Sequence, residues 1–233
     1  MNKWLADRML KVFSSHLHPV TVTHIDTPVD GLKRVRFEGS LNGAEYKPGN
    51  VIEFRITDEE FRHYTPAHLD LEQGFCDVLF YIHGLGVGSQ WVDALTVGTE
   101  THLMGPGDKM SYETNNTSHV FFGDETSLGF AQAMTSAAHL TNDRTQTILE
   151  LDSDHKHWPE AIGLTGNLQV IDKDTLDQKL PRLDLTEATS SSIYYLTGCA
   201  KSIQQFKQFL KAQGVARKQV KTMPYWAEGK HGL

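Results

Sequence analysis

The chain of 233 residues lacks several features that would define common classes of protein. It has only two cysteines, Cys76 and Cys199, too few for a disulfide framework or for the four thiolates that usually hold an iron–sulfur cluster. No apolar run approaches the length of a membrane span, and the densest patch, residues 78–82, is as short as one strand. The N-terminus has no signal-peptide pattern. These absences predict a cytoplasmic protein in a reducing compartment, without membrane insertion.

Positive charge is also scarce. The 22 lysines and arginines are outnumbered by 29 aspartates and glutamates, which gives a formal net charge of -7. Because phosphate backbones bind basic surfaces, this balance argues against nucleic acid as the main partner. The 12 histidines show no recognised metal-ligand spacing, so no metal site is predicted.

The pattern of apolar residues changes once along the chain. Residues 2–15 have the periodicity of one helix, which we expect to pack on its own domain. From residue 18 to 104, short β-like runs alternate with glycine, proline and asparagine, interrupted by one helix near 89–95, which indicates an antiparallel sheet or small barrel. Further on, strand and helix patterns alternate, which indicates a parallel sheet. We therefore expect a β-barrel domain at 1–114 and an α/β domain at 115–233.

Residues 62–65 carry the first candidate site. On a strand, residues two apart point to one face, so Arg62 and Tyr64 should project together. The guanidinium can bind phosphate oxygens and the ring can cover a flat ring system, while Thr65 and the backbone can bond ring heteroatoms. The same pattern also fits a surface charge beside a half-buried ring.

A glycine-rich stretch forms the second candidate site. Gly84, Gly86 and Gly88 follow a predicted strand and precede a helix that Ser89 can cap. Backbone N–H groups of such a loop can turn toward an anion that also faces the positive end of the helix. The stretch therefore fits a phosphate cradle, and it fits a glycine-rich hairpin with a capped helix equally well.

Two strand-to-helix turns of the second half lie where α/β sheets bind ligands. The first, at residues 122–129, is not a GxGxxG fingerprint, and Asp124 and Glu125 would repel a pyrophosphate there. Its alternative interpretation is an acidic helix start capped by Thr126. The second turn contains Cys199, but no second cysteine or basic neighbour supports a catalytic thiol.

Taken together, these stretches resemble the siderophore-interacting protein family, the ferric-siderophore reductases of the ferredoxin–NADP reductase superfamily. The likeness covers the chain from about residue 20 to its end. The motifs that carry it, in the family's order, are Arg62-x-Tyr64-Thr65, His83-Gly84 followed by Gly88-Ser89-x-Trp91, Gly105-Pro106-Gly107, Gly123-Asp124-Glu125-Thr126 and Tyr225-Trp226-x-x-Gly229.

The resemblance implies an antiparallel Greek-key barrel that binds FAD, followed by a parallel-sheet domain that binds NADH or NADPH. The implied contacts to the isoalloxazine and phosphates are Arg62, Tyr64 and Thr65. The further implied cofactor contacts are His83, Gly84, Gly88, Ser89, Trp91, Thr126 and Trp226. Three positions depart from the family pattern: Ala67 replaces a second arginine, Cys199 replaces a glutamate, and residues 170–172 replace a tryptophan-containing strand end.

The implied function is transfer of electrons from NADH or NADPH through FAD to Fe(III) in a siderophore. Oxygen chelators hold Fe(III) much better than Fe(II), so one electron releases the metal. The flavin carries the chemistry, and no side-chain acid or base is expected to be essential. We expect a monomer whose contacts to an anionic siderophore are Lys33, Lys109 and Lys230.

The sequence leaves other functions open. Reduced ferredoxin could replace the nicotinamide as electron donor. The acceptor of a flavin reductase could instead be a quinone, free flavin or a carrier protein. A siderophore-binding or flavin-binding protein without turnover is the alternative outside enzymes.

Overall fold

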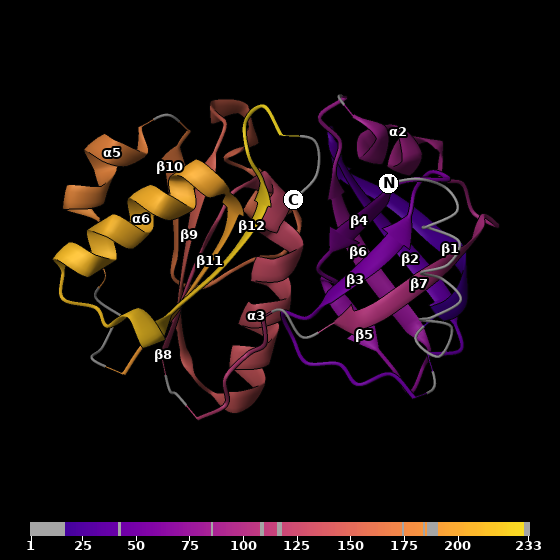
Figure 1. Cartoon of the computed structure of the whole chain (residues 1–233), viewed down its shortest axis with the longest axis horizontal. Coiled ribbons are helices and arrows are strands. Elements are labelled where there is room, and N and C mark those ends of the chain that lie inside the picture. The colour runs from indigo at the N-terminus through magenta and orange to yellow at the C-terminus, as the bar shows by residue number, and fades with distance from the viewer. Residues whose placement is uncertain are drawn as a thin grey trace. The chain divides into compact units, whose positions relative to one another are not determined.

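The computed structural model describes residues 17–41, 43–84, 86–107, 110–115, 118–173, 175–183, 185 and 191–230. The chain divides into two compact units, Met1–Ser111 and Tyr112–Leu233 (Figure 1). The helix expected at 2–15 and the predicted substrate contact Lys109 lie outside the described residues.

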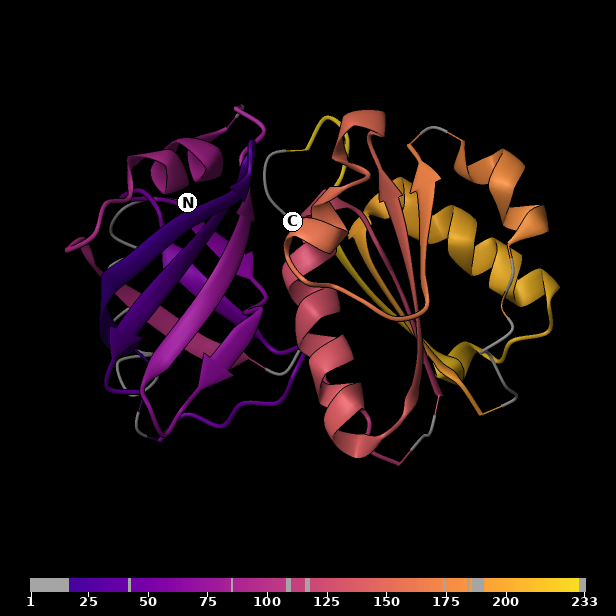
Figure 2. The ribbon, with the colours of Figure 1, turned by 180° about the vertical axis from the view of Figure 1, so that it is seen from behind.

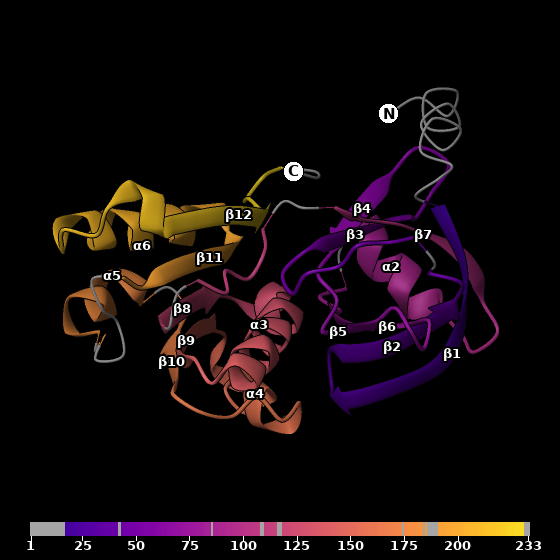
Figure 3. The ribbon, with the colours of Figure 1, turned by 90° about the horizontal axis from the view of Figure 1, so that it is seen from below.

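The first unit is an antiparallel sheet of seven strands in the order β4-β3-β7-β1-β2-β6-β5. The sheet curls around its core, as Figure 3 shows, and confirms the predicted antiparallel fold. Its strands are β1 (Leu17–Val29), β2 (Leu32–Gly39), β3 (Val51–Arg55), β4 (Phe61–Tyr64), β5 (His68–Asp70), β6 (Phe75–Tyr81) and β7 (Glu100–Gly107).

One helix of the first unit, α2 (Val87–Ala94), lies at one end of the barrel (Figures 1 and 3). Val92 is buried in the barrel core, and the Trp91 ring lies 5.3 Å from the Phe54 ring of β3. The helix ends where the ammonium of Lys33 donates to the carbonyl oxygens of Val92 and Asp93, at 2.9 and 3.1 Å. A cation at this end complements the helix dipole.

The second unit is a parallel sheet of five strands, in the order β10-β9-β8-β11-β12. The strands are β8 (Ser118–Gly123), β9 (Arg144–Leu151), β10 (Leu168–Asp172), β11 (Ile193–Cys199) and β12 (Val220–Trp226). The helices are α3 (Leu128–Thr141), α4 (Trp158–Ala161), α5 (Leu176–Lys179) and α6 (Ala200–Ala212). This architecture confirms the predicted parallel α/β domain.

Helices α3 and α6 lie on opposite faces of this sheet (Figures 2 and 3). Successive residues of β8 point to opposite faces, so the Phe121 ring meets Phe130 of α3 at 6.3 Å while the Phe122 ring meets Phe206 of α6 at 4.4 Å. Burial on both faces explains why residues 120–122 of β8 are apolar without polar alternation.

The strand order reverses between β8 and β11. From β8 the chain proceeds outward through β9 to β10, and it then crosses to the other side of β8 to form β11 and β12. In open α/β sheets, ligands bind outside the carboxyl ends of the strands at such a reversal. The turns after Gly123 and Gly198 therefore flank the expected ligand site of the second unit.

Candidate functional site

Strand β4 presents Arg62 and Tyr64 to the core side of the barrel. In its pairing with β3, Arg62 lies opposite Phe54 and Tyr64 lies opposite Ile52. Both partners on β3 are fully buried, and paired residues of neighbouring strands share a face. His63 belongs to the other face, so the strand places the predicted cation and aromatic ring together.

The Tyr64 ring is held by other aromatic rings. It packs edge-on against Phe80, with centroids 4.7 Å apart, and lies 6.2 Å from Phe54. Burial raises the pKa of Tyr64 to about 12, so its phenol remains protonated at neutral pH. The hydroxyl can therefore donate a hydrogen bond to a ligand.

The guanidinium of Arg62 is anchored by its own strand but keeps solvent access. It donates to the carbonyl oxygen of Phe61 at 2.8 Å and pairs with Glu60 at 3.2 Å, while 28% of the side chain is exposed. A guanidinium has five N–H donors, so these two contacts leave it able to bind phosphate oxygens.

The start of α2 lies against this strand. A Cβ atom added to Gly88 would lie 3.3 Å from Tyr64 Oη and 3.7 Å from Arg62 Cγ. Ser89 accepts a hydrogen bond from the backbone N–H of His83 at 3.2 Å and so fixes the chain before the helix. The first turn of α2 contains no acidic residue, so its positive end is not neutralised there. We call Arg62, Tyr64, Gly88, Ser89 and Trp91 the β4–α2 cluster.

Two details of α2 differ from the sequence prediction. The helix begins at Val87, before the expected start at residue 89, and Gly86 occupies the N-cap position. Ser89 therefore lies inside the first turn, where its hydroxyl bonds the approaching chain instead of capping the helix.

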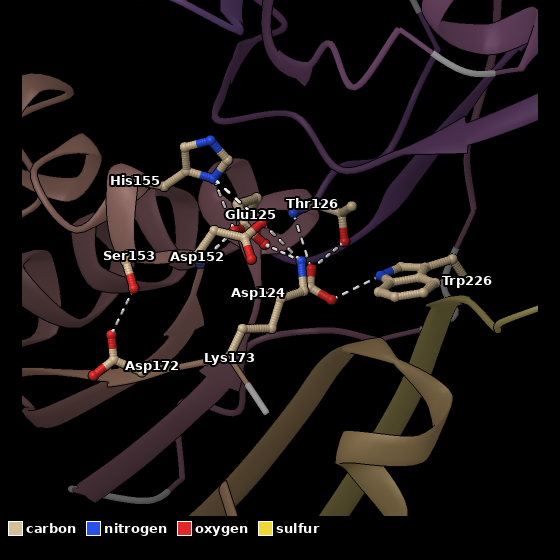
Figure 4. Close-up of polar contacts among 9 residues, drawn as sticks. All are labelled: Asp124, Glu125, Thr126, Asp152, Ser153, His155, Asp172, Lys173 and Trp226. Carbon is tan, nitrogen blue, oxygen red and sulfur yellow. Dashed lines mark hydrogen bonds and ion pairs between the residues drawn. The ribbon is translucent and has the colours of Figure 1, made fainter. Parts of the chain in front are cut away.

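In the second unit, the buried carboxylate of Asp124 joins three segments (Figure 4). Oδ1 accepts from the N–H of Thr126 at 2.9 Å and also from its hydroxyl. Oδ2 accepts from the backbone N–H of Cys199 at 2.8 Å and from the indole N–H of Trp226 at 2.7 Å. Burial raises the pKa of Asp124, and the bonds from Thr126 and Trp226 oppose that rise.

The end of β11 has room for this carboxylate only because residue 198 is glycine. A Cβ on Gly198 would lie 2.6 Å from the Asp124 carboxylate, and its φ of 91° is a conformation that side chains disfavour. The hydrogen bond from Trp226 to Asp124 thus joins the end of β12 to the end of β8 across the strand reversal.

Glu125 turns to the other side and meets a second group of charges (Figure 4). Its buried carboxylate accepts from the N–H of Asp152 at 2.8 Å and lies 2.9 Å from Nδ1 of His155. The ammonium of Lys173 lies 3.4 Å from Glu125 and 3.2 Å from Asp152. Burial disfavours the charge on Lys173, but Glu125 and Asp152 outweigh it and raise the pKa of the ammonium. We call Glu125, Asp152, His155 and Lys173 the strand-end cluster.

Three members of this cluster have the composition of a metal site. Ligand atoms of Glu125, Asp152 and His155 lie within 4.8 Å of one another, the one such group among the residues that the structure describes. Lys173 already supplies a positive charge to both carboxylates. We therefore interpret the group as a charge network and assign no metal to it.

The structure places the predicted contacts Thr126 and Trp226 on Asp124. The alternative interpretation of this turn made Thr126 the helix cap, but Asp124 fulfils this role for a 3₁₀ turn, and α3 begins only at Leu128. Lys33, a predicted substrate contact, is engaged at the end of α2, whereas Lys230 is exposed.

Sequence reasoning missed the strand-end cluster as a unit. Asp152 directly follows β9, and Lys173 directly follows β10. Both positions lie at the carboxyl edge of a parallel sheet, where functional residues gather. Charged residues just after predicted strands were the signal that could have found them.

Comparisons with known proteins decide the family. The model for "Siderophore-interacting protein" matches residues 116–229, and that for "Siderophore-interacting FAD-binding domain" matches residues 51–110. The chain belongs to the siderophore-interacting protein family. Because the matched barrel model is an FAD-binding domain, FAD is the cofactor of this family member.

Solved structures of siderophore-interacting proteins and of a ferredoxin reductase share the fold of this chain. The siderophore-interacting protein from Acinetobacter baumannii is 18% identical, with a TM-score of 0.76 and 92% of each chain covered. SipS from Aeromonas hydrophila is 19% identical, with a TM-score of 0.74 and 93% of each chain covered. The ferredoxin reductase in carbazole 1,9a-dioxygenase is 19% identical, with a TM-score of 0.74 over 90% of this chain and 68% of that one. At these identities the likeness establishes the fold.

A curated relative matches locally. NADH-cytochrome b5 reductase 1 from Dictyostelium discoideum is 35% identical over 57 residues, and the match covers 24% of this chain. The match spans only 20% of that protein's length. The matched FAD-binding domain supports a flavin-dependent oxidoreductase. Within the described part of the chain, no helix is both long and apolar enough to cross a membrane.

The β4–α2 cluster fits an FAD cofactor. Its guanidinium and the start of α2 can bind phosphates, and the Tyr64 and Trp91 rings can face flat ring systems. The bare Cα of Gly88 leaves space beside Tyr64 that a Cβ would fill. Ala67 is 6% exposed, so the position of the family's second arginine contributes a small core residue here. Phosphate binding then depends on Arg62 and α2.

Proposed function

We propose that this protein transfers electrons from NADH or NADPH through FAD to ferric iron held in a siderophore. The observation that carries the proposal is the β4–α2 cluster, which joins a cation, two aromatic rings and a helix start within an FAD-binding domain of the siderophore-interacting family. The strand reversal of the second unit, with the family's second domain, supports a nicotinamide dinucleotide as donor.

The electron count determines what the protein must supply. One NADH gives up a hydride, so two electrons reduce two Fe(III) to two Fe(II), with release of NAD⁺ and one proton. When bound, FAD supplies the exchange between a two-electron donor and one-electron acceptors. The residues of the β4–α2 cluster bind and orient the cofactor: Arg62 takes phosphate oxygens, and Tyr64 offers a protonated hydroxyl.

An anionic siderophore needs positive charge on a protein whose net charge is -7. Our proposed contacts are Lys230, which is exposed, and Lys109. Lys33 is less suited, because its ammonium already donates to the carbonyls of Val92 and Asp93. Replacing Lys109 and Lys230 together by alanine should raise the KM for an anionic ferric siderophore without loosening α2.

Anaerobic spectroscopy tests the proposal directly. The purified protein, loaded with FAD, should bleach on addition of NADH or NADPH and regain its yellow colour on addition of a ferric siderophore. A ferrous chelator should trap two Fe(II) per nucleotide oxidised. The control variant Arg62→Ala should lose bound FAD.

Three results would contradict the proposal in different ways. Failure to bind FAD would remove its basis. If only reduced ferredoxin bleaches the flavin, the electron donor is ferredoxin and not NADH or NADPH. If the yellow colour returns with a quinone, free flavin or a carrier protein, but not with a ferric siderophore, the proposed acceptor is wrong. If no acceptor is reduced at all, the protein is a binding protein and not an enzyme.

A further inference from the structure

The strand reversal also determines where each part of a dinucleotide would bind. In doubly wound sheets the pyrophosphate lies at the reversal and the adenosine extends over the second strand. An acidic residue there bonds the ribose hydroxyls of NAD, whereas a cation accepts the additional phosphate of NADP. In this chain the second strand is β9, which lies beside β8, and the first residue after it is Asp152.

Asp152 is both fixed and accessible. Its backbone N–H donates to the buried Glu125 carboxylate at 2.8 Å, which holds the end of β9 in place. Its side chain is 44% exposed, with Oδ2 3.2 Å from the ammonium of Lys173. One side of the carboxylate is therefore oriented by a cation, while the group as a whole still reaches solvent.

The neighbouring charges leave little attraction for a second phosphate. Lys173 is shared between Glu125 and Asp152, at 3.4 and 3.2 Å. Asp172, the last residue of β10, pairs with Lys156 at 2.5 Å, and the charge of Lys179 also acts on it. Among the residues described at this edge, the lysines nearest the end of β9 are thus already matched with carboxylates.

We infer that this protein selects NADH over NADPH, and that Asp152 determines the choice. The carboxylate accepts hydrogen bonds from the 2′- and 3′-hydroxyls of the adenosine ribose and repels a 2′-phosphate. Lys173 positions the carboxylate and is held by it, so it does not offer its charge to the nucleotide. The inference rests on the proposed use of a nicotinamide dinucleotide.

Calorimetric titration of the FAD-loaded full chain with NAD⁺ and NADP⁺ tests this choice without turnover. We expect the wild-type protein to bind NAD⁺ at least tenfold more tightly than NADP⁺. Asp152→Asn keeps the shape of the side chain, removes its charge and frees Lys173 from one partner. The ratio of the affinities for NAD⁺ and NADP⁺ should therefore fall at least fivefold. The matched control Glu160→Gln makes the same charge change on an exposed residue of α4 and should leave the preference unchanged.

A second variant keeps the test informative if Asp152→Asn disturbs folding. Asp152→Glu retains the charge and should retain the preference for NAD⁺. Equal or tighter binding of NADP⁺ by the wild-type protein would overturn the inference, as would equal shifts in Asp152→Asn and Glu160→Gln. If neither nucleotide binds or bleaches the flavin, the proposed donor itself is wrong, which separates that failure from a wrong choice of nucleotide.

Discussion

The hydrogen bond between Trp226 and Asp124 gives the sharpest test of how the second unit is held together. Replacing Trp226 by phenylalanine removes the indole N–H, which donates to Asp124 Oδ2 at 2.7 Å, and keeps an aromatic ring at the end of β12. The carboxylate retains its bonds from Thr126 and Cys199. The variant therefore isolates one bond to a buried charged group.

The expected loss follows from the kind of bond. Hydrogen bonds to charged groups contribute about 1.5–3 kcal/mol to stability. Lys173 lies 5.9 Å from the Trp226 ring, and the weaker cation–π contact of a phenylalanine ring adds about 0.5 kcal/mol or less because the site is partly exposed. We expect the free energy of unfolding to fall by about 2 kcal/mol in Trp226→Phe.

Urea unfolding followed by far-ultraviolet circular dichroism measures this loss. Thr222→Val, on an exposed position of the same strand, is the control and should change the free energy by about 0.5 kcal/mol or less. Because the Trp226 bond lowers the pKa of Asp124, it stabilises the charged form. The penalty of Trp226→Phe should therefore be full at high pH and shrink as pH falls through the folded-state pKa of Asp124. A loss below about 0.5 kcal/mol, or a penalty that grows on acidification, would refute this reasoning.

Three further predictions concern the barrel. Gly88→Val should weaken FAD binding at least tenfold in a fluorescence titration, because its side chain would press on Tyr64 and Arg62, and unchanged affinity would exclude the cluster as the flavin site. Lys33→Met should destabilise the first unit by about 1 kcal/mol in urea unfolding by removing the cation at the end of α2. Tyr64→Phe should change the rate of flavin reduction by the same factor at every pH between 6 and 9, because the Tyr64 pKa of about 12 keeps the phenol protonated over that range. The stability that the protonated Tyr64 phenol gives the wild-type protein should be lost only as pH rises from about 10 toward 12.

The sequence predicted the elements that have their own periodicity. The alternation of strand and helix patterns in the second half indicated a parallel sheet, and Phe130 of α3 and Phe206 of α6 do cover β8 from opposite faces. Alternation along β4 placed Arg62 and Tyr64 on one face, because that relation depends only on strand geometry. Both relations follow from the geometry of the strand and do not require its partners to be known.

Helix starts were harder to predict, since several residues competed for each cap. Ser89 and Thr126 are both good cap residues by type. In the structure Ser89 bonds the N–H of His83, and Asp124 takes the cap position before Thr126. Each outcome depends on the position of the backbone where the preceding strand ends. The cap preferences of single residues do not determine that position.

The acidic turn after β8 shows why the charge pattern of the site could be understood only with the strand order. In sequence, Asp124 and Glu125 are simply two carboxylates that would repel a phosphate at a helix start. In the fold they point to different neighbours: Asp124 bonds Trp226 from β12, and Glu125 meets Lys173 beyond β10. β12 and β10 are opposite edges of the sheet. On one side of the strand reversal Asp124 therefore binds the end of β12, and on the other side Glu125 pairs with the ammonium of Lys173. Both carboxylates of this turn are thus engaged in internal bonds, and Asp152 is the partly exposed carboxylate to which we assign the choice of nucleotide.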